Sequence, residues 1–211
     1  MTYLAKLSNA SLVTVVTPKI KYKMVHPPED QPRNNFRWEP LLTERIESFV
    51  EKNGPIIFYD VGSAFGIFSK LVSLLDKRNK VFAFEPYTPR WMANVVNTLF
   101  CSNSHLHKKY VGDEVKSGFI TLEEFSKISG TVPDLIKMDI EGAEYEALLS
   151  AENWLKEHKP TILLEFHENI MNNTGRNPQV LLDLFDRLGY AVTKVDHHDT
   201  SIGNYVLELT P

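Results

Sequence analysis

Cysteine is nearly absent from this sequence, which has Cys101 alone in 211 residues. One cysteine allows no internal disulfide and no cysteine-based zinc site, and such a composition is typical of a reducing compartment. The sequence also lacks any apolar run near the roughly 20 residues that a membrane-spanning helix needs. Its first 18 residues are too polar for a signal-peptide core and lack a small-x-small cleavage motif. We therefore expect a soluble, cytoplasmic protein with no membrane span.

An excess of positive charge is also lacking, since 23 Lys and Arg stand against 27 Asp and Glu, for a net charge of -4. This balance argues against a surface built to neutralise phosphates, so we expect no nucleic-acid partner. The short basic clusters at 19–23 and 105–109 are expected to be solvated strand edges. At 43% hydrophobic and 24% charged, the composition is that of an ordered globular chain.

Short apolar runs alternate with helical patterns from about residue 55 onwards, which predicts an α/β fold with a mostly parallel sheet. The last two apolar runs, at 191–195 and 205–209, flank a polar turn and predict a C-terminal antiparallel hairpin. The expected strands are 56–59, 81–84, 106–111, 135–138 and 161–164, and the expected helices are 67–78, 89–100, 122–128, 143–155 and 180–188.

The first 40 residues differ in composition from the rest. Six of the twelve prolines lie between Pro18 and Pro55, and the pattern predicts a hairpin over 11–25 followed by an extended segment over 27–33. We therefore expect residues 1–40 to form an arm or lid on one domain that spans 41–211.

A glycine turn stands where the first strand of this domain gives way to its first helix: Asp60-Val61-Gly62-Ser63-Ala64-Phe65-Gly66. In open α/β sheets, ligands bind at the carboxyl ends of the strands. Gly62 allows the turn, and the small Ser63 and Ala64 would let backbone N–H groups approach a ligand. An ordinary tight turn is the alternative reading.

Two acidic residues support the interpretation of this turn as a ligand-binding site. Asp60 could fix the loop or accept a hydrogen bond from a ligand amine. Glu85 lies 19 residues beyond Gly66, about where an acidic residue would bind ribose hydroxyls. The Gly-x-Gly-x-x-Gly spacing of dinucleotide sites is missing, because Ala64 replaces the second glycine and Gly66 comes one residue early. The pattern favours a nucleoside that carries an amine and no phosphate, such as S-adenosylmethionine.

A second polar cluster follows the fourth and fifth predicted strands. Asp139, Glu165 and His167 should converge at the same edge of the sheet, where one of them could accept a proton from an attacking hydroxyl. Such a set could instead hold Mg²⁺ or another divalent cation. Glu141 and Glu144 are expected to be ordinary N-terminal helix charges.

Two further segments contain residue types that are common in functional sites. His197-His198-Asp199 looks like a metal-binding tract but is expected to be a solvated loop, and we assign no metal ligands. Trp38, with Glu39 and Pro40, is the aromatic residue we expect to close over the cofactor.

The sequence resembles the FkbM family of S-adenosylmethionine-dependent methyltransferases over about residues 36 to 168. Its most specific match is Lys-x-Asp-x-Glu-Gly-x-Glu over 137–144. The other matching segments are 58–66, 84–86, 121–123, 134–136 and 163–165. The sequence departs from the family pattern at two places. Ser63-Ala64-Phe65 replaces the more usual Ala-Asn-x, which puts one asparagine contact in doubt. Glu123 replaces a more usual aspartate.

The resemblance implies a Rossmann-like methyltransferase fold with a seven-stranded sheet whose last strand is antiparallel. It also implies S-adenosylmethionine as cofactor, with Glu85 at the ribose, Gly112-Asp113 near the adenine and Asp139 beside the transferred methyl. The cofactor-binding residues are then expected to be Asp60, Gly62, Ser63, Ala64, Phe65, Gly66, Glu85, Pro86, Gly112, Asp113 and Asp139.

The function we expect is O-methylation of a hydroxyl on a small molecule, sugar or glycolipid by in-line methyl transfer. The candidate bases, in order of preference, are His167, Asp139 and Glu165. A metal-assisted O-methyltransferase, a nicotinamide-dependent oxidoreductase and a nonenzymatic nucleoside-binding module remain the alternatives. A nucleic-acid methyltransferase is disfavoured, because no Asp-Pro-Pro-Tyr-type motif follows the fourth strand.

Overall fold

The computed structural model describes residues 10–26, 37–199 and 204–211, and only the backbone of 196–199 and 204. The extended segment expected over 27–33 lies outside this part of the chain. Among the helices described, none combines the length and the hydropathy that a bilayer crossing requires.

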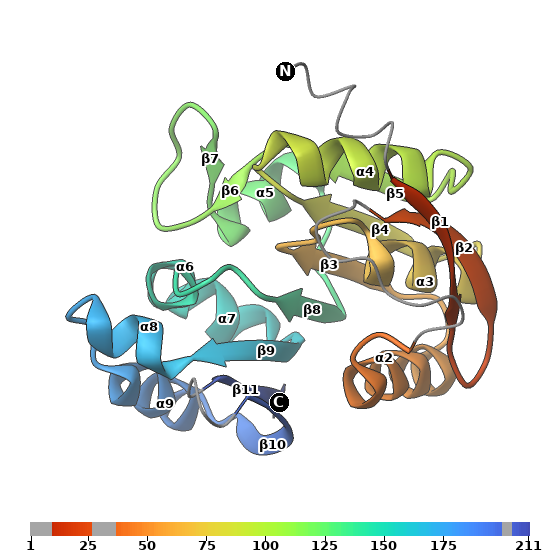
Figure 1. Cartoon of the computed structure of the whole chain (residues 1–211). Helices are drawn as coiled ribbons and strands as arrows, with labels where there is room; N and C mark the ends of the chain where they lie inside the picture. Colours follow the sequence, from red (N-terminus) through yellow and green to blue (C-terminus); the bar gives the residue numbers. More distant parts are fainter. Residues whose placement is uncertain (1–9, 27–36, 200–203) are drawn as a thin grey trace.

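A seven-stranded sheet forms the centre of the molecule, in the order β10-β11-β9-β8-β3-β4-β5 (Figure 1). Strands β3, β4, β5, β8 and β9 are parallel, whereas β11 pairs antiparallel with both β9 and β10. The predicted fold, with its C-terminal antiparallel hairpin, is therefore confirmed. The strands are β3 Ile57–Val61, β4 Lys80–Phe84, β5 Ser104–His107, β8 Leu135–Met138, β9 Thr161–His167, β10 Ala191–Asp199 and β11 Asn204–Thr210.

Helices cover both faces of the sheet, because its central strands are apolar on both sides. One hydrophobic cluster joins α2 and α3 to one face, and the other joins α5, α6, α7 and α9 to the opposite face. Helix α4 packs beside α3 and β5. The helices are α2 Pro40–Asn53, α3 Ile67–Leu75, α4 Thr88–Thr98, α5 Leu122–Ser129, α6 Glu144–Ser150, α7 Glu152–His158, α8 Glu168–Asn173 and α9 Pro178–Arg187.

The predicted N-terminal hairpin is present as β1 (Ser11–Val16) and β2 (Lys21–His26). Its inward side chains join the hydrophobic cluster of α2 and α3, and the Tyr22 hydroxyl donates to the Ile67 carbonyl at 3.1 Å. This hairpin therefore packs against the domain along its length (Figure 1). The boundary at residue 40 stays a prediction.

Four local predictions were wrong or incomplete. The strand expected over 106–111 is divided, because the Lys109 N–H turns back to the His107 carbonyl, and β6 (Tyr110–Val111) pairs separately with β7 (Phe119–Ile120). The helix expected over 143–155 breaks at Ala151 into α6 and α7. The last hairpin is longer than expected, so 197–199 belong to β10 rather than to a turn. Helices α2 and α8 were not predicted.

Candidate functional site

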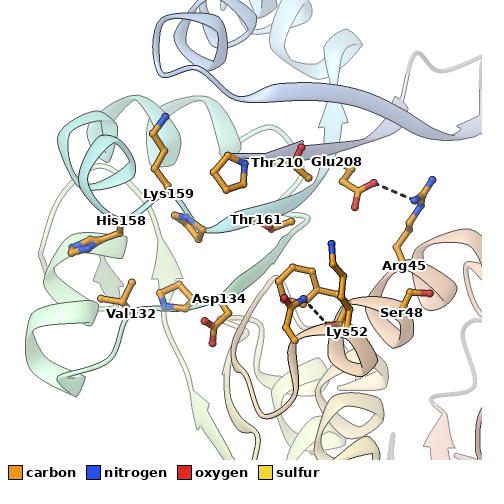
Figure 2. A pocket seen from close by; sticks show the side chains of 15 residues that line it. Arg45, Ser48, Lys52, Val132, Asp134, His158, Lys159, Thr161, Glu208 and Thr210 are labelled. Carbon is orange, nitrogen blue, oxygen red and sulfur yellow. Dashed lines mark hydrogen bonds and ion pairs between the residues drawn. The ribbon is translucent and has the colours of Figure 1, made fainter.

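Hollows lie at both ends of the sheet. A cavity of about 690 Å³ at the amino ends of β8 and β9 is lined by Arg45, Lys52, Asp134 and Thr161 (Figure 2). It contains none of the residues predicted from the sequence. Because open α/β sheets bind ligands at the carboxyl ends of their strands, we place the functional site at the opposite end.

Two adjoining cavities, of about 260 and 180 Å³, lie at the carboxyl ends of β3, β4 and β8. Both are lined by Gly62, Arg90, Asp139 and Glu141, so they flank the same turn. The larger cavity adds Glu85 with a mostly apolar wall, made of Pro86, Tyr87, Tyr110, Val111 and Ile140. The smaller adds Ser63, Ala64 and Phe65 of the glycine turn, with Trp38 and Glu39 at its side.

The glycine turn is held by close packing. Gly62 has φ 76° and lies so near the end of β8 that a Cβ would stand 1.7 Å from the Asp139 carbonyl oxygen. Gly66 has φ 81° and caps α3, where a Cβ would stand 2.1 Å from Asn94 Oδ1. Both positions therefore require glycine, and the turn packs against Asp139 at one end and against α4 at the other.

Three backbone N–H groups of this turn donate to the end of β4. Those of Gly62 and Ser63 donate to the Phe84 carbonyl at 3.0 Å, and that of Ala64 donates to Glu85 Oε2 at 3.0 Å. The expectation that N–H groups of the turn approach a ligand stays a prediction. The shape of the turn, by contrast, is fixed by these contacts.

Glu85 joins the turn to the loop after β4. Besides Ala64, its carboxylate accepts the Tyr87 N–H at 2.7 Å, and it lines the larger cavity. Burial raises the pKa of Glu85, whereas the hydrogen bond from the Tyr87 N–H and the charge of Arg90 lower it. With two donors bound, a carboxylate keeps lone pairs free for further donors, so Glu85 can bind hydroxyl groups in the cavity.

Asp60 lies behind the cavities. Its side chain is fully buried, accepts a hydrogen bond from the Ser69 hydroxyl at 2.5 Å, and lines neither cavity. Burial raises its pKa, while the charge of Lys137 acts in the opposite direction. Of the two roles predicted for Asp60, bracing the loop agrees with this position, whereas contact with a ligand amine does not.

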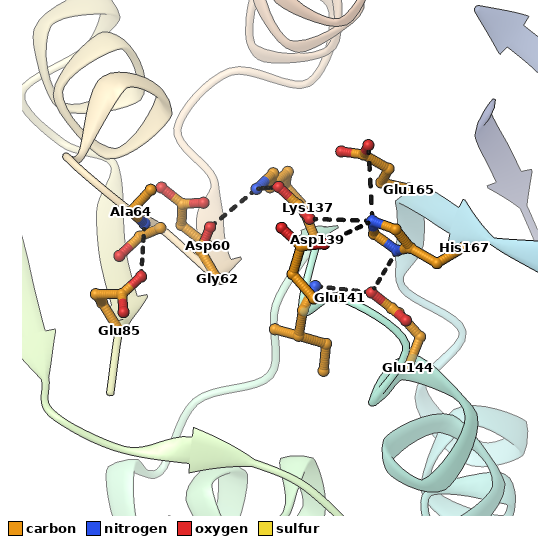
Figure 3. Close-up of polar contacts among 12 residues, drawn as sticks. Asp60, Gly62, Ala64, Glu85, Lys137, Asp139, Glu141, Glu144, Glu165 and His167 are labelled. Atoms are coloured by element: carbon orange, nitrogen blue, oxygen red, sulfur yellow. Dashed lines mark hydrogen bonds and ion pairs between the residues drawn. The ribbon is translucent and has the colours of Figure 1, made fainter. Parts of the chain in front are cut away.

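Lys137 connects the turn to the acidic cluster (Figure 3). Its buried ammonium donates to the Gly62 carbonyl at 3.0 Å and to Asp139 Oδ2 at 3.3 Å. Burial alone would lower its pKa, but the charges of Asp139 and Asp60 raise it. In the sequence, Lys137 is part of the motif over 137–144, and the motif alone predicts no role for it.

Asp139, Glu165 and His167 converge as predicted (Figure 3). Nε2 of His167 lies 3.7 Å from an oxygen of Asp139 and 3.7 Å from an oxygen of Glu165, and 3.6 Å from Glu141. Its Nδ1 lies 3.0 Å from Glu144 Oε1. Asp139 reaches the cavities, while the imidazole of His167 is only 1% exposed.

The charges of this cluster shift two pKa values. Burial would lower the pKa of His167, but Glu144, Asp139 and Glu165 raise it to about 9. Burial and the charge of Asp139 raise the pKa of Glu165 to about 7, against the opposing charge of His167. The cluster therefore favours the protonated form of His167 at neutral pH and makes Glu165 a weaker acid than an exposed glutamate.

Two predicted residues fall outside the site. Gly112 and Asp113 follow β6 and line neither cavity, and Asp113 is exposed, although the preceding Tyr110 and Val111 do line the larger one. Glu144 was missed as a site residue, because a glutamate in the first turn of a helix is ordinarily explained by the helix dipole.

The sequence of the chain matches a known family over part of its length. Residues 101–192 match the methyltransferase FkbM domain family. The match confirms the resemblance to this family that the sequence shows, over less than half of the chain. This FkbM domain match includes Lys137, Asp139, Glu144, Glu165 and His167, whereas the glycine turn and Glu85 precede it. A comparison with curated protein sequences finds no significant match.

Solved structures share the fold of the chain at low identity. A methyltransferase FkbM from Methylobacillus flagellatus KT is 22% identical, with a TM-score of 0.54 over 74% of this chain and 43% of its own. The chain therefore spans less than half of that protein. A precorrin-6y C5,15-methyltransferase from Geobacter metallireducens GS-15 is 14% identical (TM-score 0.55; 81% of this chain, 88% of its own). An rRNA methylase from Streptococcus thermophilus is 11% identical (TM-score 0.54; 78% and 92%).

Proposed function

We propose that the protein binds S-adenosylmethionine and transfers its methyl group to a hydroxyl of a small molecule, sugar or glycolipid. The observation that carries the proposal is the pair of carboxylates, Glu85 and Asp139, that line adjoining cavities on the two sides of Gly62. The FkbM domain match adds the reaction class.

The lining residues fit this cofactor. The wall of the larger cavity, which includes Pro86, Tyr110 and Ile140, suits an aromatic base, and Glu85 beside it can bind two neighbouring ribose hydroxyls. The carboxylates of Asp139 and Glu141 face the same space and complement a cationic group. Bound S-adenosylmethionine would supply a methyl group on a positively charged sulfur.

Glu165 is the residue we propose as proton acceptor. Its carboxylate lies outside the lining of the two cavities but near Asp139, which lines both, since each of the two stands 3.7 Å from Nε2 of His167. A general base works best when its pKa lies near the operating pH, and the pKa of Glu165 is raised to about 7. His167, the first candidate base predicted from the sequence, has a pKa raised to about 9 and therefore keeps its proton at neutral pH. Asp139 is paired with Lys137, and we assign it to binding the reacting groups. The rest of the catalysis is positioning and exclusion of water by the cavity walls.

Calorimetry tests the cofactor. We expect S-adenosylmethionine to bind the intact protein, and Glu85→Gln to weaken binding at least tenfold, because an amide cannot accept from both loop N–H groups and the ribose. The control is Glu123→Gln on α5, whose partner is Lys127; it should bind as the wild type does. Absence of binding heat in the folded wild type, or binding of NADH instead, would refute the proposal.

Metal assistance is the second candidate mechanism. Asp139, Glu144 and His167 offer ligand atoms within 4.8 Å of one another, which is the observation in its favour. Both oxygens of Glu144, however, accept backbone N–H groups, and a metal ion would have to displace these bonds. Methyl transfer that stops with EDTA and returns with Mg²⁺ or Mn²⁺ would establish the metal-assisted reaction.

A nucleic-acid acceptor is tested separately, since the rRNA methylase shares the fold. The net charge of -4 supports a small-molecule acceptor. Labelled methyl transfer to cell-extract metabolites, and none to RNA, is the result we expect.

A further inference from the structure

Asn97 is a buried residue of α4 whose side chain bonds to segments far from it in the sequence. It is only 4% exposed. Its Oδ1 accepts the Val25 N–H at 2.6 Å, and its Nδ2 donates to the Val25 carbonyl at 2.9 Å. The side-chain amide therefore pairs with the end of β2 as the backbone of a neighbouring strand would.

The same side chain also binds the glycine turn. Its Nδ2 donates a second hydrogen bond to the Phe65 carbonyl at 2.8 Å, so both amide hydrogens and the amide oxygen have partners. One turn earlier on the same helix face, Asn94 Nδ2 donates to the Ser63 hydroxyl at 2.9 Å. Asn94 thus binds the turn, whereas Asn97 joins the turn to the β1–β2 hairpin.

The last residue of the hairpin contacts the lining of the site. His26 ends β2 and is fully buried, and its ring centroid lies 5.1 Å from that of Phe65 and 6.4 Å from that of Trp38. Both of these aromatic residues line the smaller cavity. The backbone of Trp38 is fixed separately, because the Thr43 hydroxyl of α2 donates to its carbonyl at 2.7 Å. Two aromatic residues of the cavity lining therefore pack against the end of the hairpin.

Pairing of a strand edge explains only part of this arrangement. The two bonds to Val25 satisfy backbone groups on the side of β2 that faces away from β1, and they would hold the hairpin by themselves. The bond to the Phe65 carbonyl and the ring contacts of His26 do something else. They fix the position of residues that line a cavity.

We propose that Asn97 is a positioning residue for the smaller cavity, which acts through Phe65 and His26 to place the aromatic wall against the methionine part of the cofactor. The proposal rests on the proposed function, in which the adenosine part fills the larger cavity beside Glu85. The rest of the cofactor then extends past Gly62 into the smaller cavity. Asn97 itself lines neither cavity. The β1–β2 hairpin thereby contributes to the binding site.

Two ligands that differ in the methionine part test this role. Calorimetry compares S-adenosylmethionine with 5′-methylthioadenosine, which keeps the adenosine and the sulfur but lacks the amino-acid part, on wild type and Asn97→Ala. We expect Asn97→Ala to weaken S-adenosylmethionine about tenfold or more, because the turn and the hairpin lose their common partner. Binding of 5′-methylthioadenosine should change less than about twofold, because neither Phe65 nor Trp38 lines the larger cavity. A purely structural role would weaken both ligands alike.

The matched control is Asn53→Ala at the end of α2, an exposed asparagine that donates to the Phe49 carbonyl and lines neither cavity; it should bind both ligands as the wild type does. If Asn97→Ala does not fold, His26→Ala replaces it and must show the same selective loss of S-adenosylmethionine. Equal weakening of both ligands, or unchanged binding of S-adenosylmethionine, would overturn the positioning role alone. A folded wild type that binds neither ligand would overturn the proposed function as well.

Discussion

At the scale of single residues, Lys137 has the most consequences for its neighbours. It stands in the middle of β8 among Leu135, Ile136 and Met138, all buried. Its ammonium binds the glycine turn and Asp139, and it provides positive charge near the fully buried Asp60. A buried charge is tolerated where opposite charges and hydrogen bonds surround it. Lys137 therefore stabilises the arrangement of the turn and the acids together.

Lys137→Met should show this role. Removal of one partner leaves buried carboxylates without their cation, so we expect a loss of about 3 to 5 kcal/mol in the free energy of unfolding. Urea denaturation followed by circular dichroism measures it. The double variant Lys137→Met with Asp60→Asn should recover part of the loss, because Asp60 then needs no counter-ion. A double variant no more stable than Lys137→Met would contradict the coupling.

Residue periodicity predicted part of this site. The period of two along a strand places Glu165 and His167 on one side of β9 and Phe166 on the other, in agreement with the contact of the first two and the packing of Phe166 against Tyr205. The environment of each group was not predictable, because it depends on contacts with other elements. Glu144 is the clearest case, since its partner His167 lies 23 residues away.

At the scale of elements, the unit β3–turn–α3 determines the position of the site. The turn bends sharply at Gly62, binds the β4 end through the Phe84 carbonyl, and lies against the β8 end at Asp139. Three strand ends are therefore held by one loop. This packing explains why both cavities share Gly62 and Asp139.

Gly62→Ala should be far more harmful than an alanine at another positive-φ glycine. At Gly62 a methyl group would meet the Asp139 carbonyl, whereas at Gly130 (φ 63°) nothing lies within 4 Å. We expect Gly130→Ala to cost about 1 to 2 kcal/mol from backbone strain alone and Gly62→Ala clearly more, with loss of S-adenosylmethionine binding. Thermal denaturation and calorimetry measure the two effects. Equal losses of stability would show that the close approach to Asp139 does not matter.

At the scale of the whole molecule, the acidic cluster links stability to pH. The pKa of Glu165 is raised from 4.5 to about 7 and that of His167 from 6.5 to about 9. In both cases the folded protein binds the proton more tightly than the unfolded chain does. The contribution of His167 is therefore present below pH 6.5 and is lost as the pH rises through 9. The contribution of Glu165 to stability is likewise lost as the pH rises from 4.5 through 7.

We expect the free energy of unfolding to fall by about 2 to 3 kcal/mol between pH 6.5 and 9.5, mostly from His167. Urea denaturation across this range measures the slope. His167→Gln should flatten it, whatever its effect on stability at pH 7. His158→Gln, at the far end of the sheet beside the cavity of Figure 2, should keep the wild-type slope. An unchanged slope in His167→Gln would assign the pH dependence to other groups.

The alternation of strands and helices, the glycine turn and the acids at the strand ends were determined by local sequence. Their signals are short-range: apolar periodicity and residues adapted to one backbone conformation. The FkbM motif likewise lies in one continuous segment. The tertiary structure alone decided what each group does. Burial separated Asp60 from the cavities, three N–H groups of the turn donate within the protein, and three carboxylates from different elements raise the pKa of His167. Solvation and charge at a site depend on contacts between distant segments, which the order of residues does not display.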